Sequence, residues 1–307
     1  GGPLLAVYEQ IAANKRKTVI LFVLAVVLLG GVGYAIGLLT DSGPVGLVIA
    51  LIVAIAMSVG SYLYGDRIVL ASTRAREVSK EDEPRLHNIV EGLAIAAGIP
   101  KPRVWIVPES APNAYATGRD PEHSHVAATQ GLLESMNRVE LEGVIGHEMA
   151  HVVDRDILVG TVVATLVGAA VLLAEFFMRM WWWGGFRGRR GGDSGGGAAS
   201  ALIFAVGFLL LILAPIFGQL IRLAVSRNRE FLADAQGAML TRYPPGLIAA
   251  LKKLQTAPTA MRSANNATAH LWLNQPSRIE GERLGVMERL FSTHPPLSER
   301  IRRLEEM

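Results

Sequence analysis

The chain has 307 residues and a formal net charge of +3, and half of its residues are hydrophobic, which gives a mean hydropathy of +0.33. So much apolar surface excludes a mainly disordered protein, and the absence of cysteine excludes disulfides, cysteine nucleophiles and thiolate-bound metals. The small net charge, without a basic stripe, argues against nucleic acid as a partner.

Two uncharged runs near the N-terminus predict a membrane hairpin. Residues 18–39 and 42–65 form uncharged runs of 22 and 24 residues. Each run is long enough to cross a bilayer as a helix. A short turn that contains glycine and proline joins them, and the basic residues 15–17 precede the first run. We therefore expect a helical hairpin anchored in the lipid bilayer.

Short β-rich segments follow the hairpin. Residues 103–107 and 125–129 predict strands, and residues 113–117 between them predict an exposed sheet edge. Such an edge can bind an extended peptide as an additional strand. The residues expected to bind the peptide are Asn113, Ala114, Tyr115 and Ala116. A plain connecting strand is the alternative.

The next segment carries the strongest chemical signal. Residues 147–151 have the H-E-x-x-H pattern inside a helix predicted over residues 137–154. The spacing of four places His147 and His151 on one helical face, close enough to share a metal ion. Glu148 can approach an open position of that metal without binding it, which suits a general base for hydrolysis. The alternative is an amphipathic helix with two incidental histidines.

A second pair of apolar segments comes after this helix. Residues 157–178 and 198–221 predict a second membrane hairpin, with a membrane-dipping or core hairpin as the alternative. The tryptophans 181–183 suit an interfacial anchor, and the Gly/Arg-rich residues 184–197 predict a loop. If all four segments cross, ten basic residues flank one face and four flank the other. The face with ten is expected in the cytoplasm.

Two carboxylates lie just beyond the second hairpin. Glu230 and Asp234 are four residues apart and hence on one helical face. One of them can serve as the third metal ligand, and the other can accept the N–H of a ligating histidine. A solvated charged face is the alternative. His151 and Glu230 can share a metal only if the segments between them cross the membrane an even number of times.

These motifs together resemble the HtpX family of membrane-anchored zinc metalloproteases, which are gluzincins related to the CAAX prenyl proteases. The similar segments are NAYATGR at residues 113–119, GHEMAHVVDRD at 146–156, SRNREFLAD at 226–234 and THPPLSERI at 293–301. The resemblance implies that His147, His151 and Glu230 bind one Zn²⁺ per chain and that Glu148 is the catalytic base. It also implies an active site that faces the cytoplasm and a role in proteolytic quality control of membrane proteins.

The predicted fold is a mainly α-helical membrane protein. Four apolar helices form two hairpins, and an α+β zincin-like catalytic domain contains a small sheet and the H-E-x-x-H helix. The expected parts are a basic N-terminal segment (1–17), a membrane hairpin (18–65), the first half of the catalytic domain (66–156), the second hairpin with its loop (157–221, 184–197) and the second half of the domain (222–307).

The predicted activity is hydrolysis of peptide bonds in polypeptides, mainly membrane proteins, at the cytoplasmic (inner) membrane of a bacterium or archaeon. His294 and Arg227 are candidate donors to the oxyanion, and His270 is a weaker one. Arg300 is expected on a solvated C-terminal helix. The alternatives are an intramembrane zinc protease, which the charges around the motif disfavour, and a zinc-stabilised scaffold or chaperone-like binder without proteolytic activity. The sequence predicts no oligomeric state.

Overall fold

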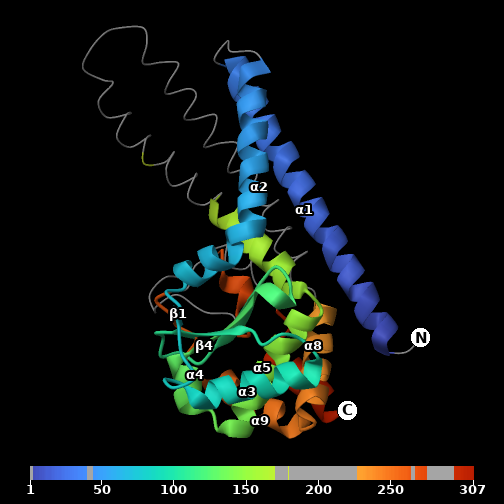
Figure 1. Ribbon diagram of the computed structural model, residues 1–307, viewed down its shortest axis with the longest axis vertical. Helices are drawn as coiled ribbons and strands as arrows, with labels where there is room; N and C mark the ends of the chain where they lie inside the picture. The colour runs from blue at the N-terminus through green and yellow to red at the C-terminus, as the bar shows by residue number, and fades with distance from the viewer. Residues whose placement is uncertain (1–2, 40–43, 170–178, 180–226, 264–266, 275–293) are drawn as a thin grey trace.

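The computed structural model describes residues 3–39, 44–169, 179, 227–263, 267–274 and 294–307. Two long N-terminal helices project from a globular part, which contains the sheet and most of the other described helices (Figure 1). The N-terminal helix begins beside the globular part and runs away from it, and the second helix returns.

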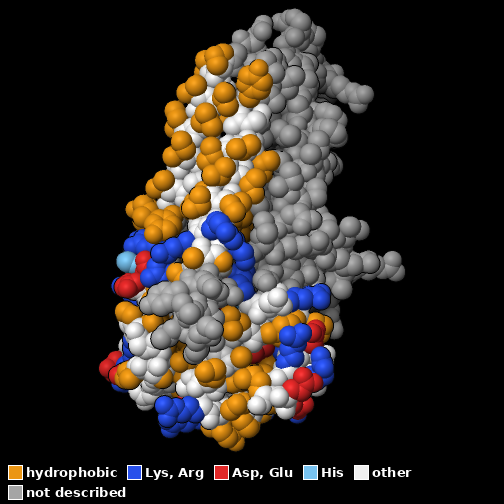
Figure 2. Space-filling model, turned by 90° about the vertical axis from the view of Figure 1, so that its right-hand side faces the viewer, with side chains coloured by type: hydrophobic (Ala, Val, Ile, Leu, Met, Phe, Trp, Pro, Cys, Tyr) orange, Lys and Arg blue, Asp and Glu red, His pale blue; other side chains and the backbone are white. Residues whose placement is uncertain are grey.

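The first hairpin consists of α1 (Pro3–Leu39) and α2 (Pro44–Ser72). Figure 2 shows that hydrophobic side chains cover the outer surface of these helices and that Lys and Arg side chains lie near their base. Among the described residues, α2 is the one helix that is long and apolar enough to cross a membrane. The basic residues 15–17 belong to α1 itself rather than to a separate segment.

The prediction of four membrane-spanning helices is not confirmed. Most of the second apolar hairpin lies outside the described residues. The part that is described forms the shorter apolar helix Asp156–Ala169, whose residues are largely buried within the protein.

The sheet contains β1 (Arg76–Glu77), β2 (Arg103–Val107), β3 (Ala114–Gly118) and β4 (Ser124–Thr129), in the order β1-β2-β4-β3. The β2–β4 pair is parallel and the other pairs are antiparallel. The strands predicted at residues 103–107 and 125–129 are confirmed. Gly118 ends β3 with φ 144°, and a Cβ there would lie 2.2 Å from the carbonyl oxygen of His123. Only glycine fits this close turn.

Helices cover the sheet and enclose its core. The described helices of this part are α3 (Pro84–Ala97), α4 (Gln130–Ser135), α5 (Arg138–Val153), α8 (Arg227–Thr241), α9 (Pro244–Thr256) and α11 (Leu297–Glu305), with 3-10 turns at Pro121–His123 and Ala269–Leu271. One apolar cluster joins the sheet to α3, α5, α9 and α11. Helix α5, which carries the H-E-x-x-H motif, therefore lies in the middle of the globular part.

Candidate metal centre and active site

The start of α5 is fixed by its own sequence. Asn137 accepts a hydrogen bond from the backbone N–H of Glu140, and Glu140 accepts one from the backbone N–H of Asn137. This capping box satisfies two otherwise unpaired donors and sets where the helix begins. His147 and Glu148 then lie in the third turn, with 1% and 2% of their surface exposed. Buried ionisable side chains on a central helix need partners from other elements.

Glycines bring α8 unusually close to α5. A Cβ on Gly237 of α8 would lie 2.7 Å from the backbone nitrogen of His147, and a Cβ on Gly146 would lie 3.1 Å from the carbonyl oxygen of Gly237. Both distances are too short for ordinary side chains. The close approach places Glu230, two turns earlier on α8, beside the two histidines of α5.

Gly237→Ala is therefore expected to push α8 away from α5. Overpacking of this kind costs about 1–3 kcal/mol, and it also separates Glu230 from His147. We expect a lower Tm and weaker zinc binding, measured on purified protein in detergent. Gly92→Ala on α3 is the matched control, because a Cβ there meets nothing within 4 Å. If Gly237→Ala behaves like this control, the close approach does not constrain the site.

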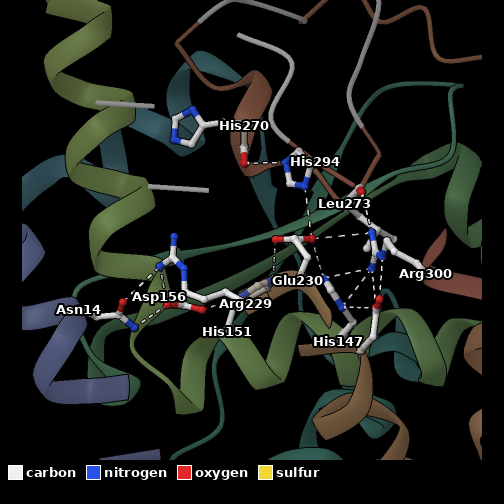
Figure 3. Close-up of polar contacts among 11 residues, drawn as sticks. Asn14, His147, His151, Asp156, Arg229, Glu230, His270, Leu273, His294 and Arg300 are labelled. Atoms are coloured by element: carbon white, nitrogen blue, oxygen red, sulfur yellow. Dashed lines mark hydrogen bonds and ion pairs between the residues drawn. The ribbon is translucent and has the colours of Figure 1, made fainter. Parts of the chain in front are cut away.

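His147, His151 and Glu230 form the metal-binding group predicted from the sequence. Nε2 of His147 lies 3.1 Å from Nε2 of His151. The carboxylate oxygens of Glu230 lie 3.7 Å from each of these nitrogens. A tetrahedral zinc ion with bonds of about 2.1 Å has ligand atoms about 3.4 Å apart. The three side chains thus fit zinc in chemistry and in spacing (Figure 3).

Each histidine has a carboxylate partner on its other ring nitrogen. Nδ1 of His147 lies 2.9 Å from Asp234, and Nδ1 of His151 lies 3.2 Å from Asp156. Each carboxylate also binds an arginine, Arg300 for Asp234 and Arg229 for Asp156. These contacts fix the ring orientation and leave both Nε2 atoms directed toward the metal position.

Charge and burial shift the pKa values within this group in opposite directions. Burial and the nearby Arg300 lower the pKa of His147 to about 4, which favours the neutral, metal-binding ring. Burial also lowers the pKa of His151, but Asp156, Glu230 and Glu148 outweigh burial and raise it to about 9. Burial raises the pKa of Glu230, but His294 and the two motif histidines outweigh it and hold the value well below the usual range. Glu230 is thus anionic, as a candidate metal ligand needs to be.

Glu148 lies in the same cavity but outside the cluster of ligand atoms. Burial is the main cause that raises its pKa to about 7, and the negative Glu230 adds to this effect. A buried carboxylate with a pKa near neutrality is suited to accept and release protons. Glu148 shares this cavity with His147, His151 and Glu230, so it lies beside the candidate metal position.

The two candidate oxyanion donors have different locations. His294 lines the cavity, with Nδ1 3.3 Å from Glu230 and Nε2 3.0 Å from the carbonyl oxygen of His270. Arg227 is exposed at the start of α8 and does not line the cavity. His270 also lines it, but Nε2 of His270 lies 3.1 Å from the carbonyl oxygen of Gly160.

Only one of the four residues predicted to bind a peptide lines the cavity. Ala116 lines the cavity. Asn113 instead binds the backbone of Asn274, and the hydroxyl of Tyr115 bonds with Thr73. Ala114 accepts a hydrogen bond from the backbone N–H of Leu273, so this end of the β3 edge is already paired.

Three polar residues around the site were not predicted from the sequence to be site residues. Arg300 was expected to be solvated, and this prediction is wrong, because its side chain is fully buried against Asp234. Asp156 and Arg229 are buried together in the same way beside His151. The sequence gives one signal for them, since both lie inside segments that resemble family motifs. Their pairing joins residues 73 positions apart, and such pairs are not visible in local patterns.

Comparisons with known proteins show which family the chain resembles. Residues 80–307 match Peptidase family M48. A protein of Streptococcus agalactiae named "Protease HtpX homolog" is 46% identical over 301 residues, which cover 98% of this chain and 99% of the relative. Relatives of the same name from Lactobacillus acidophilus and Thermoanaerobacter pseudethanolicus are each 44% identical, over 98% of this chain and 99% and 97% of their own. Among solved structures, Ste24p of S. mikatae aligns with a TM-score of 0.47 and 17% identity, over 98% of this chain and 67% of its own.

Proposed function

The chain belongs to peptidase family M48 and to its HtpX-type members, and from this membership we propose that it is a membrane-associated zinc endopeptidase whose ion is held by His147, His151 and Glu230. We propose one zinc ion per chain, since a single group of three ligand residues is present among the described residues. The observation that carries the proposal is the convergence of α5 and α8. It brings two imidazoles and a carboxylate together beside the uncoordinated Glu148.

Zinc held by His147, His151 and Glu230 would lower the pKa of a bound water and would polarise the scissile carbonyl. Glu148 takes up the proton of the attacking water and later transfers it to the leaving amine. Asp234 and Asp156 accept hydrogen bonds from the Nδ1–H groups of His147 and His151. These bonds keep the Nε2 atoms of both histidines free for the metal. Arg300 and Arg229 compensate the charges of these two carboxylates.

His294 is the residue that we assign to stabilise the oxyanion, because it lines the cavity close to Glu230. His294→Ala is expected to retain zinc and to lower kcat by about 10²–10³-fold, which is the usual effect of losing one such donor. Arg227→Ala, at an exposed position, is the control and should change kcat little. Equal kcat values for the two variants would remove His294 from the reaction.

The substrate is proposed to be an extended polypeptide that binds beside Ala116. The cavity wall contains the apolar residues Ile157, Leu271, Trp272 and Leu273 next to the histidines. Backbone pairing beside Ala116, combined with an apolar wall, would give loose sequence specificity. Such specificity suits an enzyme that degrades misfolded or damaged membrane proteins.

We further propose that the chain resides in the cytoplasmic membrane with the active site on the cytoplasmic side. The long apolar helix α2 and the exposed apolar residues of α1 support this location. The basic residues 15–17 immediately before the first apolar run support the cytoplasmic side. A second hairpin formed by residues 157–178 and 198–221 stays a proposal, as does the division into domains made from the sequence. Nothing supports the non-proteolytic scaffold.

Removal of the metal tests this function. Full-length protein in detergent is expected to cleave casein, to stop when 1,10-phenanthroline is added, and to recover when Zn²⁺ is restored, because the attacking water depends on the metal. A non-chelating phenanthroline isomer is the control. Cleavage that continues after complete removal of zinc would contradict the proposal.

A further inference from the structure

Asn14 of α1 is a buried polar residue far from the motifs in sequence. Its exposure is 1%, and a buried amide needs hydrogen-bond partners. Nδ2 donates to the carbonyl oxygen of Asp154 at 3.0 Å and to Oδ1 of Asp156 at 2.5 Å. Oδ1 of Asn14 accepts a bond from Nη1 of Arg229 at 3.2 Å. Two of these partners, Asp156 and Arg229, lie beside His151 of the candidate metal centre (Figure 3).

Asp156 connects Asn14 to the metal ligand His151. Its Oδ1 accepts bonds from Asn14 and from Arg229, and its Oδ2 lies 3.2 Å from Nδ1 of His151. The two oxygens belong to one planar carboxylate, so fixing Oδ1 also fixes the direction of Oδ2. Because the partner on Nδ1 sets the orientation of a metal-binding imidazole, Asn14 acts on His151 through Asp156.

Asn14 also supports the turn that brings Asp156 back toward His151. Helix α5 ends at Val153, and Asp154 is its C-cap. Arg155 then has φ 57°, in the left-handed region that is unfavourable for a non-glycine residue. The bond from Asn14 to the carbonyl of Asp154 holds this unfavourable turn in place.

The position of α1 does not depend on Asn14. Leu21 and Ala25 of α1 pack into an apolar cluster with Leu158, Val162 and other residues of the helix Asp156–Ala169. This packing lies about two to three turns beyond Asn14 along α1. Helix α1 should therefore stay docked when the amide is removed.

We propose that Asn14 is a positioning residue of the metal centre, which makes the N-terminal helix part of the active site as well as a membrane anchor. The proposal rests on the proposed zinc site and names a residue outside the segments that match the family motifs. Asn14 lies four residues before the first apolar run, so in the proposed membrane topology the same helix would enter the bilayer and orient a metal ligand.

The test is a double-mutant cycle on zinc affinity, measured with full-length protein in detergent by competition with a chromogenic chelator. Asn14→Ala and Asn14→Leu are each expected to weaken zinc binding about tenfold, at the low end of the effect of outer-shell residues. In an Asp156→Ala background, the same changes are expected to weaken binding less than about twofold, because the link to His151 is already lost. The leucine variant fills the space of the amide and serves if the alanine variant folds poorly.

Thr18→Val is the matched control, since Thr18 is also buried on α1 and its hydroxyl bonds only the backbone oxygen of Asn14 among the described residues. The visible spectrum of Co²⁺-substituted protein should change in the Asn14 variants and not in Thr18→Val. Unchanged zinc affinity in the Asn14 variants, or equal losses in both backgrounds, would overturn the inference. If Glu230→Ala retains full zinc binding, the proposed function itself fails.

Discussion

Glu148→Gln is expected to reduce peptide hydrolysis to background while the protein retains one zinc ion per chain. The amide has almost the same shape as the carboxylate but cannot take a proton from water. Loss of a general base costs about 10²–10⁴-fold in rate. Glu148 lines the cavity and is separate from the three ligand residues, so its removal should leave the metal in place. The measurement combines kcat on casein with zinc content by mass spectrometry.

Glu142→Gln is the control for this change, because Glu142 lies on the same helix outside the cavity. It should cleave casein at the rate of the unmodified protein. If Glu148→Gln retained normal turnover in a preparation free of other proteases, Glu148 could not be the base. If it lost zinc as well as activity, the residue would act in metal binding.

Glu230→Ala is expected to lose both zinc and activity. Glu230 is one of the three side chains proposed to bind zinc, and its oxygens lie 3.7 Å from Nε2 of His147 and of His151. Without it, only the two imidazoles remain, and zinc sites of this kind use three protein ligands. We expect zinc affinity to fall by more than the roughly 10–100-fold that loss of an outer-shell partner causes. Equilibrium dialysis against buffered zinc measures the loss.

Asp234→Asn provides the comparison for Glu230→Ala, because Asp234 lies one turn further on α8 and contacts His147 without belonging to the three-residue ligand group. It should weaken zinc binding without abolishing it. Glu230→Ala binding zinc as tightly as Asp234→Asn would show that Glu230 is not a ligand.

Local patterns in the sequence predicted the elements that carry the chemistry. The helix expected over residues 137–154 is α5 (Arg138–Val153), and the strand expected over 103–107 is β2. Helical periodicity depends on neighbouring residues only, which explains this agreement. The spacing of Glu230 and Asp234 likewise placed both on one face of α8, where the structure has them directed toward α5.

Contacts between distant segments could not be predicted in this way. Arg300 lies in a charged C-terminal segment that predicted a solvated helix. Its side chain is instead buried, because Asp234, 66 residues earlier, neutralises its charge. Asn14 precedes an apolar run and carries no motif, although it bonds with Asp156 across 142 residues. The edge of β3 was expected to be exposed. This prediction is wrong: β3 is the last strand of the sheet, but all of its residues are buried and Leu273 pairs with part of it. Each case depends on tertiary packing, which sequence periodicity does not encode.

The most direct test of the metal centre is anomalous diffraction recorded on both sides of the zinc absorption edge, from crystals of the full-length protein. The account predicts one zinc peak about 2.0–2.2 Å from Nε2 of His147, Nε2 of His151 and a carboxylate oxygen of Glu230, with Glu148 beside it and unbound. A zinc peak away from these three residues, or one in which Glu148 replaces Glu230 as a ligand, would contradict it.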